Sequence, residues 1–395
     1  MKRTPASIGG ERLRVAALFA GIGGIELGLH QAGHRTTLFC ENDPGAVRVL
    51  ERRFSVEVAP DVRELATLGD VDLVTAGFPC QDLSQAGQTK GIRGRQSGLV
   101  DHVFRLLDQR RRGPRWLLLE NVSFMLHLDR GKAMRHLVDR LEERHFRWAY
   151  RVVDTRAFGL PQRRHRVIML ASRSEDPRCV LFADDAKPRQ RSFSPAHWCG
   201  FYWTEGLSGL GWAVDAVPTL KGGSTIGIPS PPAIWIPESG EFVTPEIRDA
   251  ERLQGFDADW TLPALEPSGV RRGHRWKLVG NAVSVPVAKW VGERLARPGS
   301  YDVSRSIEAP ASGVVWPKAA WGRKGQVYSV QVSTWPVRVR TRHLSGFLKY
   351  PSAPLSLRAA EGFKNRMDIS RLNFEEAFRT AMSRYVKRGA RVAVA

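Results

Sequence analysis

Short apolar runs alternate with helical stretches along the first 170 residues, and this alternation limits the possible folds more than any other feature. The runs typical of strands are "RVAALFAGIGG", "RTTLFCEND", "VDLVTAGFP", "PRWLLLENV" and "RHRVIMLASR". Helical spacing appears between them, as at Met134, Leu137, Val138 and Leu141. Strands that alternate with helices predict an α/β fold with a doubly wound, mostly parallel Rossmann-like sheet.

The composition changes after Arg173, which suggests further domains. Residues 174–245 are rich in Pro, Gly, Ser and Trp and show little helical periodicity. We expect four segments. They are a main domain at 1–173, a smaller irregular β-rich domain at 174–245, a return segment at 246–300 that completes the main domain, and a basic extension at 301–395.

Two helices are expected in the later segments. In "TPEIRDAERLQGF", Thr244 can cap a helix and Pro245 can occupy its first turn. Residues 301–395 carry 17 Lys or Arg and 6 Asp or Glu. Within them, Asn373 and Glu376 have capping-box spacing, and an apolar face follows at Phe374, Phe378, Met382 and Tyr385. The extension is therefore predicted to be folded.

The charge balance points to a polyanionic partner. The 395 residues include 60 Lys or Arg against 40 Asp or Glu, a formal net charge of +20. Such a surface attracts nucleic acid or an anionic membrane, although a GC-rich genome also enriches arginine. No uncharged stretch approaches the roughly 18 residues of a membrane span, so an intracellular protein is expected.

The four cysteines do not suggest a metal site. Cys40, Cys80, Cys179 and Cys199 contain no C-x-x-C spacing, so neither a zinc site nor a redox pair is predicted.

The glycine turn "LFAGIGG" follows a strand and precedes a helix. A dinucleotide motif would need glycine at position 26, where Glu26 stands, so a small nucleoside ligand fits better than a nicotinamide cofactor. Glu41 ends the next strand, where an acid commonly binds ribose, and Asp61 could accept a hydrogen bond from an adenine amine. The alternative is that Gly21 and Gly23 only make a tight turn.

Cys80 follows the third strand pattern directly after Pro79, where sites collect in such sheets. The next residues form a glycine-rich loop with positive charges at Lys90, Arg93 and Arg95, which could close on an anionic substrate. A thiolate near these charges would have a lowered pKa and be a better nucleophile. The alternative is an inert, buried cysteine.

Glu120 ends another strand in "LLLENV", where partial desolvation would help a carboxyl group to act as a general acid. Arg164 and Arg166 lie two apart on an extended segment, so both face the same way. Either could hold Glu120 or a substrate carbonyl. The alternatives are an ordinary strand-end salt bridge and a solvated basic edge.

Taken in order, these motifs resemble the DNA (cytosine-5)-methyltransferases. "LFAGIGG" resembles their S-adenosylmethionine motif, "GFPCQDLS" their Pro-Cys motif, "ENV" their Glu-Asn-Val motif and "QRRHR" their Gln-x-Arg-x-Arg motif. "RLQGF" and "GNAVSVPVA" match two late motifs. The resemblance covers about residues 13–173 and 244–296.

The resemblance implies covalent catalysis on cytosine. Cys80 would attack carbon 6, Glu120 would protonate or hydrogen-bond ring nitrogen 3, Arg166 would orient the ring carbonyl and Arg164 would support the site. Carbon 5 would then take the methyl group of S-adenosylmethionine. The target base would be flipped out of double-stranded DNA, and the loop that begins at Gln81 would close over it.

The resemblance also assigns binding residues. The cofactor set is Phe19, Gly21, Gly23, Glu41, Asp61, Val62, Pro79 and Asn281, with Val62 packing the adenine because Asn42 replaces the usual bulky residue. The DNA set is Gln81, Ser84, Lys90, Arg93, Arg95, Lys221 and Thr225. The 174–245 segment would be the target recognition domain, short enough to suggest a short recognition site, and no metal is expected.

Several alternatives stay open at this stage. The same fold could methylate tRNA cytosine, act as a catalytically silent DNA-binding regulator, or use a modified methyl donor. A monomer in the cytoplasm of a prokaryotic or phage-infected cell, associated with the nucleoid, is the simplest expectation. A cognate restriction endonuclease is a further candidate partner.

Overall fold

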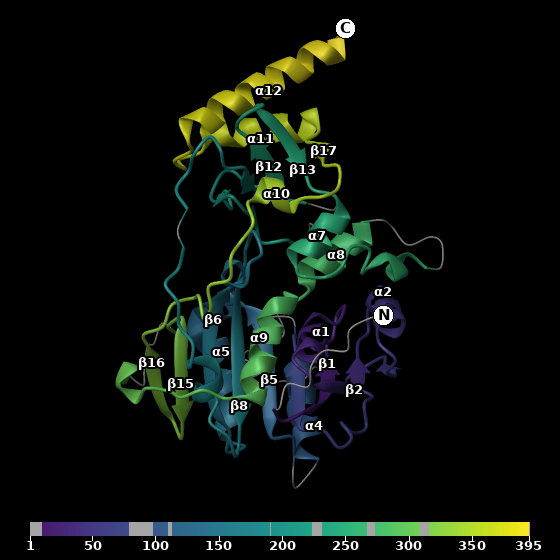
Figure 1. Ribbon diagram of the computed structural model, residues 1–395, viewed down its shortest axis with the longest axis vertical. Coiled ribbons are helices and arrows are strands. Elements are labelled where there is room, and N and C mark those ends of the chain that lie inside the picture. Colours follow the sequence, from purple (N-terminus) through teal and green to yellow (C-terminus); the bar gives the residue numbers. More distant parts are fainter. Residues whose placement is uncertain are drawn as a thin grey trace, which may run out of the picture. The chain divides into compact units, whose positions relative to one another are not determined.

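The structure, a computed structural model, describes residues 10–78, 98–109, 113–189, 191–222, 231–266, 273–308 and 316–394. Their contacts define two compact units, whose elements are labelled in Figure 1. Unit 1 comprises residues 1–157, 165–188 and 283–338, and unit 2 comprises residues 158–164, 189–282 and 339–395. Each unit therefore draws on segments that are far apart in the sequence.

Unit 1 is built on a ten-stranded sheet with the order β14-β16-β15-β6-β8-β5-β4-β1-β2-β3. Its strands are β1 (Arg14–Leu18), β2 (Arg35–Cys40), β3 (Val58–Ala59), β4 (Leu73–Ala76), β5 (Trp116–Val122), β6 (Arg147–Asp154), β8 (His165–Ser172), β14 (Ser306–Glu308), β15 (Ala319–Arg323) and β16 (Gln326–Val330). Strands β3-β2-β1-β4-β5 pair in parallel, and β8, β6, β15, β16 and β14 join antiparallel. The α/β, doubly wound fold expected from the sequence is confirmed.

The helices of unit 1 are α1 (Gly24–Gln31), α2 (Pro44–Arg53), α4 (Leu99–Asp108), α5 (Lys132–Glu142), α6 (Arg178–Leu181) and α9 (Val285–Ala296). Helix α5 buries the predicted face, since Met134, Leu137, Val138 and Leu141 are at most 1% exposed. Helix α2 begins with Pro44 in its first turn, and the Asp43 side chain caps it.

Helix α9 completes unit 1 by packing against α1. A Cβ built at Gly28 of α1 would lie 2.5 Å from the carbonyl oxygen of Val285, so the two backbones touch. His34 adds a hydrogen bond of 2.9 Å to the carbonyl of Gly292. A residue with any side chain at position 28 would separate the helices, and α1 leads directly out of the glycine turn.

Unit 2 contains a five-stranded antiparallel sheet in the order β10-β9-β12-β13-β17, and a two-stranded one, β11-β7. Its strands are β7 (Gln162–Arg163), β9 (Cys199–Phe201), β10 (Ala213–Val214), β11 (Val217–Pro218), β12 (Ala233–Ile236), β13 (Glu241–Thr244) and β17 (Ala353–Pro354). Its helices are α7 (Ile247–Leu253), α8 (Gly273–Asn281), α10 (Leu344–Phe347), α11 (Leu357–Ile369) and α12 (Glu376–Val394). Short 3₁₀ turns in the chain are η1 (Ser123–Leu126), η2 (Leu128–Gly131), η3 (Thr155–Phe158), η4 (Leu262–Leu265) and η5 (Val303–Arg305).

Most of the tryptophan-rich segment serves as core in unit 2. Phe201 and Trp235 are buried in a cluster against which Trp203 and Trp212 pack. Helices α11 and α12 cover this cluster, and Phe374, Phe378 and Met382 lie within it as predicted. The tail from residue 301 is folded, with β14, β15 and β16 in unit 1 and residues 339–395 in unit 2.

Two helix starts differ from the sequence predictions. Helix α7 begins at Ile247, and Glu246 caps it by accepting from the backbone N–H of Arg248, because Thr244 belongs to strand β13. Helix α12 begins only at Glu376, so Asn373 lies before its capping position. In the described part of the chain, no helix is both long and apolar enough to cross a membrane.

Candidate active site

The glycine turn lies at the carboxyl end of β1. Phe19, Gly21 and Gly23 have φ angles of 54°, 56° and 78°. These three left-handed residues, at alternate positions, turn the chain before α1 begins at Gly24. A Cβ at Gly23 would lie 2.5 Å from the ring of Phe54. At Gly21, by contrast, a Cβ would meet no described atom within 4 Å. Position 23 therefore requires glycine for packing and conformation, and position 21 leaves open space where a ligand can approach the backbone.

Glu41, at the end of β2, holds this turn in place. Its Oε2 accepts a hydrogen bond of 2.7 Å from the backbone N–H of Gly21. Its Oε1 accepts from the N–H groups of Asn42 and Asp43 at 2.9 and 2.8 Å. The carboxylate is thereby fixed beside the glycine turn, the arrangement expected of a ribose-binding acid.

Asp61 and Val62, assigned to the adenine by resemblance, have other partners in the structure. The Asp61 carboxylate accepts from the side chain of Arg63 at 2.9 and 3.0 Å. These hydrogen bonds hold the pKa of Asp61 below its usual range. Val62 is 4% exposed and packs into the core of unit 1. An adenine could share the Asp61 carboxylate with Arg63, whereas packing against the buried Val62 side chain does not fit this geometry.

Glu120 lies beside the end of β4. Its Oε1 is 3.0 Å from Nε of Arg166, and the carboxyl-bearing side chain is 8% exposed. The antiparallel register of β5 and β8, with Val122 opposite Arg166, brings the two together. A Cβ built at Gly77 would lie 3.6 Å from Oε2 of Glu120 and 3.9 Å from the carbonyl oxygen of Phe19. Glycine turn, strand β4 and the ion pair therefore meet at one place.

Asn121 positions the chain that leads to Cys80. Its Nδ2 donates a hydrogen bond of 3.0 Å to the carbonyl of Phe78, two residues before Cys80, and its Oδ1 accepts from the N–H of Val122 at 2.8 Å. The side chain is 6% exposed. Sequence reasoning placed Asn121 only within the "ENV" motif and gave it no role of its own.

The three described cysteines lack the properties of a nucleophile. Burial raises the pKa of Cys40 and of Cys199 to about 12, and it also raises the pKa of Cys179. A neutral thiol attacks poorly, because the thiolate is the reactive form. Cys80 itself lies outside the described residues, as do Pro79, Gln81, Ser84, Lys90, Arg93, Arg95 and Thr225.

Arg164 and Arg166 differ in burial and in partners, so the expectation that the two side chains act on the same side of the segment is not met: Arg166 pairs with Glu120, and Arg164 is buried elsewhere. The residue is 0% exposed, and its guanidinium donates to the carbonyls of Leu220, Gly280 and Ala282 at 2.7 to 3.1 Å. All of these residues belong to unit 2. A buried guanidinium with three carbonyl partners holds loops together and has no access to substrate.

Two buried glutamines extend this clamp, and sequence reasoning missed both. Nε2 of Gln162 donates to the carbonyl of Leu253 at 2.8 Å, and its Oε1 accepts from the N–H of Leu220 at 3.1 Å. Gln254 donates to the carbonyl of Val279 at 2.9 Å. The "QRRHR", "RLQGF" and "GNAVS" motifs are thus joined through main-chain carbonyls. Within "GNAVS", Asn281 is exposed.

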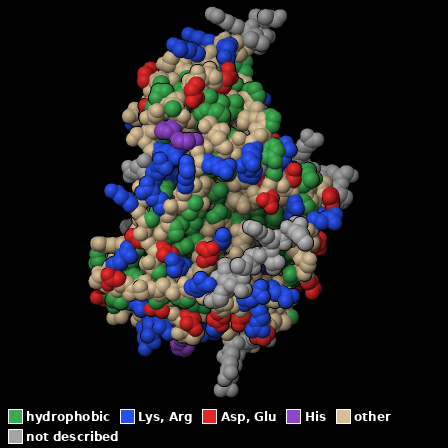
Figure 2. All heavy atoms as spheres, in the orientation of Figure 1, with side chains coloured by type: hydrophobic (Ala, Val, Ile, Leu, Met, Phe, Trp, Pro, Cys, Tyr) green, Lys and Arg blue, Asp and Glu red, His purple; other side chains and the backbone are tan. Residues whose placement is uncertain are grey.

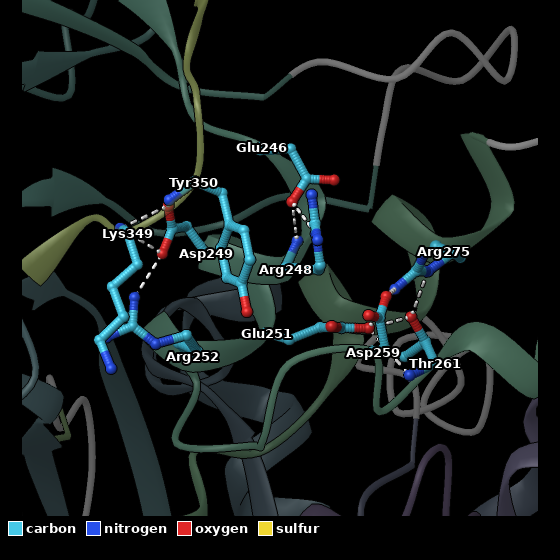
Figure 3. A network of polar contacts seen from close by, with 10 residues as sticks. All are labelled: Glu246, Arg248, Asp249, Glu251, Arg252, Asp259, Thr261, Arg275, Lys349 and Tyr350. Carbon is cyan, nitrogen blue, oxygen red and sulfur yellow. Dashed lines mark hydrogen bonds and ion pairs between the residues drawn. The ribbon is translucent and has the colours of Figure 1, made fainter.

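The "RLQGF" helix α7 also anchors the C-terminal segment of unit 2 (Figure 3). The buried Asp249 carboxylate accepts from the N–H groups of Lys349 and Tyr350 at 2.9 to 3.1 Å. Arg252 pairs with Asp249 and donates to the carbonyl of Phe347 at 2.7 Å. The motif is therefore a structural junction.

Lys221, predicted to contact DNA, is half-exposed in unit 2. It forms an ion pair with Glu205, and its ammonium lies 3.7 Å from the ring centroid of Tyr202. Its charge is already matched by one carboxylate, so a contact with phosphate would have to compete with Glu205.

Comparison with known proteins identifies the family. Residues 13–195 match the C-5 cytosine-specific DNA methylase family. The Type II methyltransferase M2.BsuMI of Bacillus subtilis (strain 168) is 49% identical over 383 residues, which cover 94% of this chain and 98% of that protein. The chain belongs to the C-5 cytosine-specific DNA methylase family. The Type II methyltransferase M.Bsp6I of Bacillus sp. (strain RFL6) is 28% identical over 72% of this chain and 98% of its own length.

Solved structures agree on the fold of this methylase. The S. pombe Dnmt2 methyltransferase superposes with a TM-score of 0.54 at 18% identity, over 72% of this chain and 98% of that one. The Entamoeba histolytica methyltransferase EhMeth gives 0.51 at 15% identity, over 72% and 98%. At these identities the likeness concerns the fold alone.

Proposed function

We propose that this S-adenosylmethionine-dependent DNA cytosine-5 methyltransferase uses Cys80 as its nucleophile, with Glu120 and Arg166 as the groups that handle the cytosine ring. The observation that carries the proposal is the meeting of Glu120 and Arg166 with Gly77, which follows β4 and precedes Cys80 by three residues in the chain. The raised pKa values of Cys40, Cys179 and Cys199 further support Cys80, because they leave it as the candidate thiolate.

The chemistry divides between these groups. The Cys80 thiolate adds to carbon 6 of cytosine, and the ring becomes an enamine with a nucleophilic carbon 5. Glu120 stabilises the charge that develops on the ring by protonating or hydrogen-bonding nitrogen 3. Arg166 orients Glu120 through their ion pair, and we assign it to the ring carbonyl. After methylation, a base removes the hydrogen on carbon 5 and the thiolate leaves.

S-adenosylmethionine supplies an electrophilic methyl group, and the residues at the end of β1 fit it. The open space at Gly21 and the left-handed Phe19 expose backbone groups for the methionine part, and the fixed Glu41 carboxylate suits the ribose hydroxyls. We assign Gly23, Asp61 and Pro79 to the same pocket, and Asn281 to its completion. Isothermal titration with S-adenosylhomocysteine tests this assignment directly, because Glu41→Ala should weaken binding without any need for turnover.

Recognition of a short sequence in double-stranded DNA is assigned to unit 2, which contains the 174–245 segment. Lys221 and Thr225 are our candidate DNA contacts there, and Gln81, Ser84, Lys90, Arg93 and Arg95 are candidates on the loop after Cys80. The net charge of +20 and the bacterial Type II relatives support DNA as the substrate. We further propose a monomer that acts in the cytoplasm, alongside a restriction endonuclease of the same specificity.

The test is bisulfite sequencing of DNA from methylation-free cells that express wild type, Cys80→Ala or Cys179→Ala. We expect protected cytosines in one short sequence context for wild type and for Cys179→Ala, and none for Cys80→Ala. If wild type protects no cytosine although it is folded and binds DNA, the enzymatic proposal fails in favour of a silent DNA-binding regulator. Protection confined to transfer RNA would move the substrate to RNA.

A further inference from the structure

A basic groove lies on unit 2, apart from the residues assigned above. It has a volume of about 910 Å³ and is lined by residues 189, 191, 196 and 197 together with residues 340–343, 345 and 346. Its lining includes four arginines and two histidines and, among the described residues, no aspartate or glutamate: Arg189, Arg191, Arg340, Arg342, His197 and His343. On the face shown in Figure 2, a band of Lys and Arg side chains lies next to histidines.

Arg340 and Arg342 are, with Arg189, the exposed arginines of this basic groove. Arg340 and Arg342 lie in a segment without regular secondary structure. Neither guanidinium has a hydrogen bond or ion pair with any residue that the structure describes. Both side chains line the same groove. Two exposed guanidinium groups in one groove are suited to successive negative charges.

The wall of the basic groove is held by a buried carboxylate. Asp215 is 3% exposed, and its Oδ1 accepts from the N–H of Leu344 at 2.7 Å. Its Oδ2 pairs with Arg191 and with Nδ1 of His343 at 2.9 Å. His197 stacks on His343 with 5.7 Å between the ring centroids. The two segments that form the groove are thereby tied together.

These residues could also be considered as a cation site. Donor atoms of His197, Asp215 and His343 lie within 4.8 Å of one another, a spacing suited to a metal ion. However, the carboxylate already pairs with Arg191, and three further arginines line the same groove. Their positive charges oppose a divalent cation and favour an anion.

A second groove with basic residues adjoins the basic groove. It has a volume of about 530 Å³, shares Arg340 and Arg342, and adds Arg252 and Lys349 together with one carboxylate, Asp257. Arg252 is occupied by Asp249 and the carbonyl of Phe347, whereas Lys349 is exposed. Two adjoining grooves with shared arginines indicate a ligand that carries several charges in a row.

We propose that the basic groove binds the sugar-phosphate backbone of the DNA substrate outside the target base, with Arg340 and Arg342 as its principal contacts. The inference rests on the proposed function, since it takes double-stranded DNA as the substrate. It assigns part of the DNA affinity to the C-terminal segment of the chain, beyond the 174–245 region. Phosphate contacts position a duplex and carry no sequence information by themselves.

The experiment measures binding of the full-length protein to a fluorescent duplex by anisotropy, with S-adenosylhomocysteine present, between 50 and about 300 mM salt. The Arg340→Ala/Arg342→Ala variant is expected to bind at least about tenfold more weakly near 150 mM salt, by a similar factor for the methylated sequence and for a scrambled one. The slope of log affinity against log salt should fall by about 2, because two phosphate contacts are lost.

The matched control is Arg358→Ala/Arg371→Ala, which removes the same charge from two exposed positions elsewhere on unit 2. It should change affinity less than about twofold and leave the salt slope unchanged. Circular dichroism confirms that both double variants are folded. Arg340→Gln/Arg342→Gln, which keeps a polar side chain at each position, provides a second test if the alanine variant fails to fold.

The proposal is overturned if the groove variant behaves like its control. It is also overturned if the variant loses affinity only for the duplex with the methylated sequence and not for the scrambled one, because that would indicate contacts with bases. A larger loss for an RNA duplex than for DNA would also overturn it. So would a rise in melting temperature with zinc chloride that His343→Ala abolishes, because that would assign a cation site. If wild type methylates DNA while the groove variant keeps its salt slope, only this inference fails. If wild type neither methylates nor binds DNA, the proposed function itself fails.

Discussion

The motif residues of unit 1 and those of unit 2 are used in different ways. At the end of β4 in unit 1, Glu120 and Arg166 pair with one another beside a glycine, and backbone groups of the glycine turn are left open. In unit 2, Gln162, Arg164 and Gln254 are completely buried, and their side-chain N–H groups donate to main-chain carbonyls. Polar motif residues that look alike in the sequence therefore divide into groups that we propose to contact the substrate and groups that hold loops in position.

The largest expected effect is a loss of activity at the unit 1 residues of this comparison. Glu120→Gln removes the carboxyl group that we propose to stabilise charge on the cytosine ring, so kcat should fall by about 10² to 10⁴-fold. Stability should change little, and affinity for S-adenosylhomocysteine should stay close to wild type. Methyl transfer from labelled cofactor and titration calorimetry measure the two quantities. A variant with wild-type kcat would remove Glu120 from the mechanism.

The neighbouring arginines provide the sharpest contrast. Arg164→Ala removes the guanidinium that donates to three buried carbonyls and should cost about 3 to 5 kcal/mol of stability. Arg166→Ala should cost less than about 1.5 kcal/mol, yet lower kcat by at least tenfold because Glu120 loses its partner. Urea denaturation monitored by fluorescence, with activity assays on the same preparations, separates the two. Equal losses of stability would contradict the division.

The two glycines of the turn should also differ. Gly23→Ala combines a φ of 78° with a clash against Phe54 and should cost about 2 to 3 kcal/mol. Gly21→Ala has the conformational strain without the clash and should cost about 1 to 2 kcal/mol, although it fills the space proposed for the cofactor. Thermal melts with and without S-adenosylhomocysteine report both effects. Loss of ligand stabilisation in Gly21→Ala is the expected signature of a filled pocket.

Glu26 shows that unit 1 also contains a buried polar group, but one that is incompletely bonded. It is 1% exposed and accepts from Oγ1 of Thr75, while its Oε2 has no hydrogen-bond partner in the described part of the chain. Burial, aided slightly by the charge of Glu41, raises its pKa from 4.5 to about 7.

Because the folded protein binds this proton more tightly, Glu26 lowers stability as pH rises from 4.5 to about 7. Glu26→Gln should remove this loss and be more stable than wild type by about 1 to 2 kcal/mol at pH 8, with a negligible difference at pH 4. Urea midpoints across this range check it. An advantage that does not grow with pH would show that Glu26 is ionised in the folded protein throughout.

The sequence located those parts of the candidate site that depend only on neighbouring residues in the chain. Strand ends, the glycine turn and Glu41 could be located because parallel strands deliver their carboxyl ends to one edge. The roles of Arg164 and Asn121 could not, because burial and the identity of a carbonyl partner depend on segments more than 40 residues away. Thr244 failed as a cap for the same kind of reason, since pairing of β13 with its neighbours outweighed the local capping preference.

The division of the tail was also beyond local reasoning. The apolar helical face within residues 301–395 indicated a folded segment, yet nothing in the sequence showed that β15 would pair with β6. Pairing over such distances is determined by which strand edge is left open once the rest of the sheet has formed.

Synthesis on the ribosome gives the sheet order of unit 1 a further consequence. Strand β6 ends at Asp154, but its neighbour β15 begins only at Ala319, and α9, which packs against α1, begins at Val285. Translation proceeds at about 5 to 20 residues per second, so β15 and α9 leave the ribosome many seconds after β6 and α1, the elements they pack against. A nascent chain of this enzyme therefore carries an unpaired strand edge for much of its translation, and fragments that stop before residue 319 should depend on chaperones or aggregate.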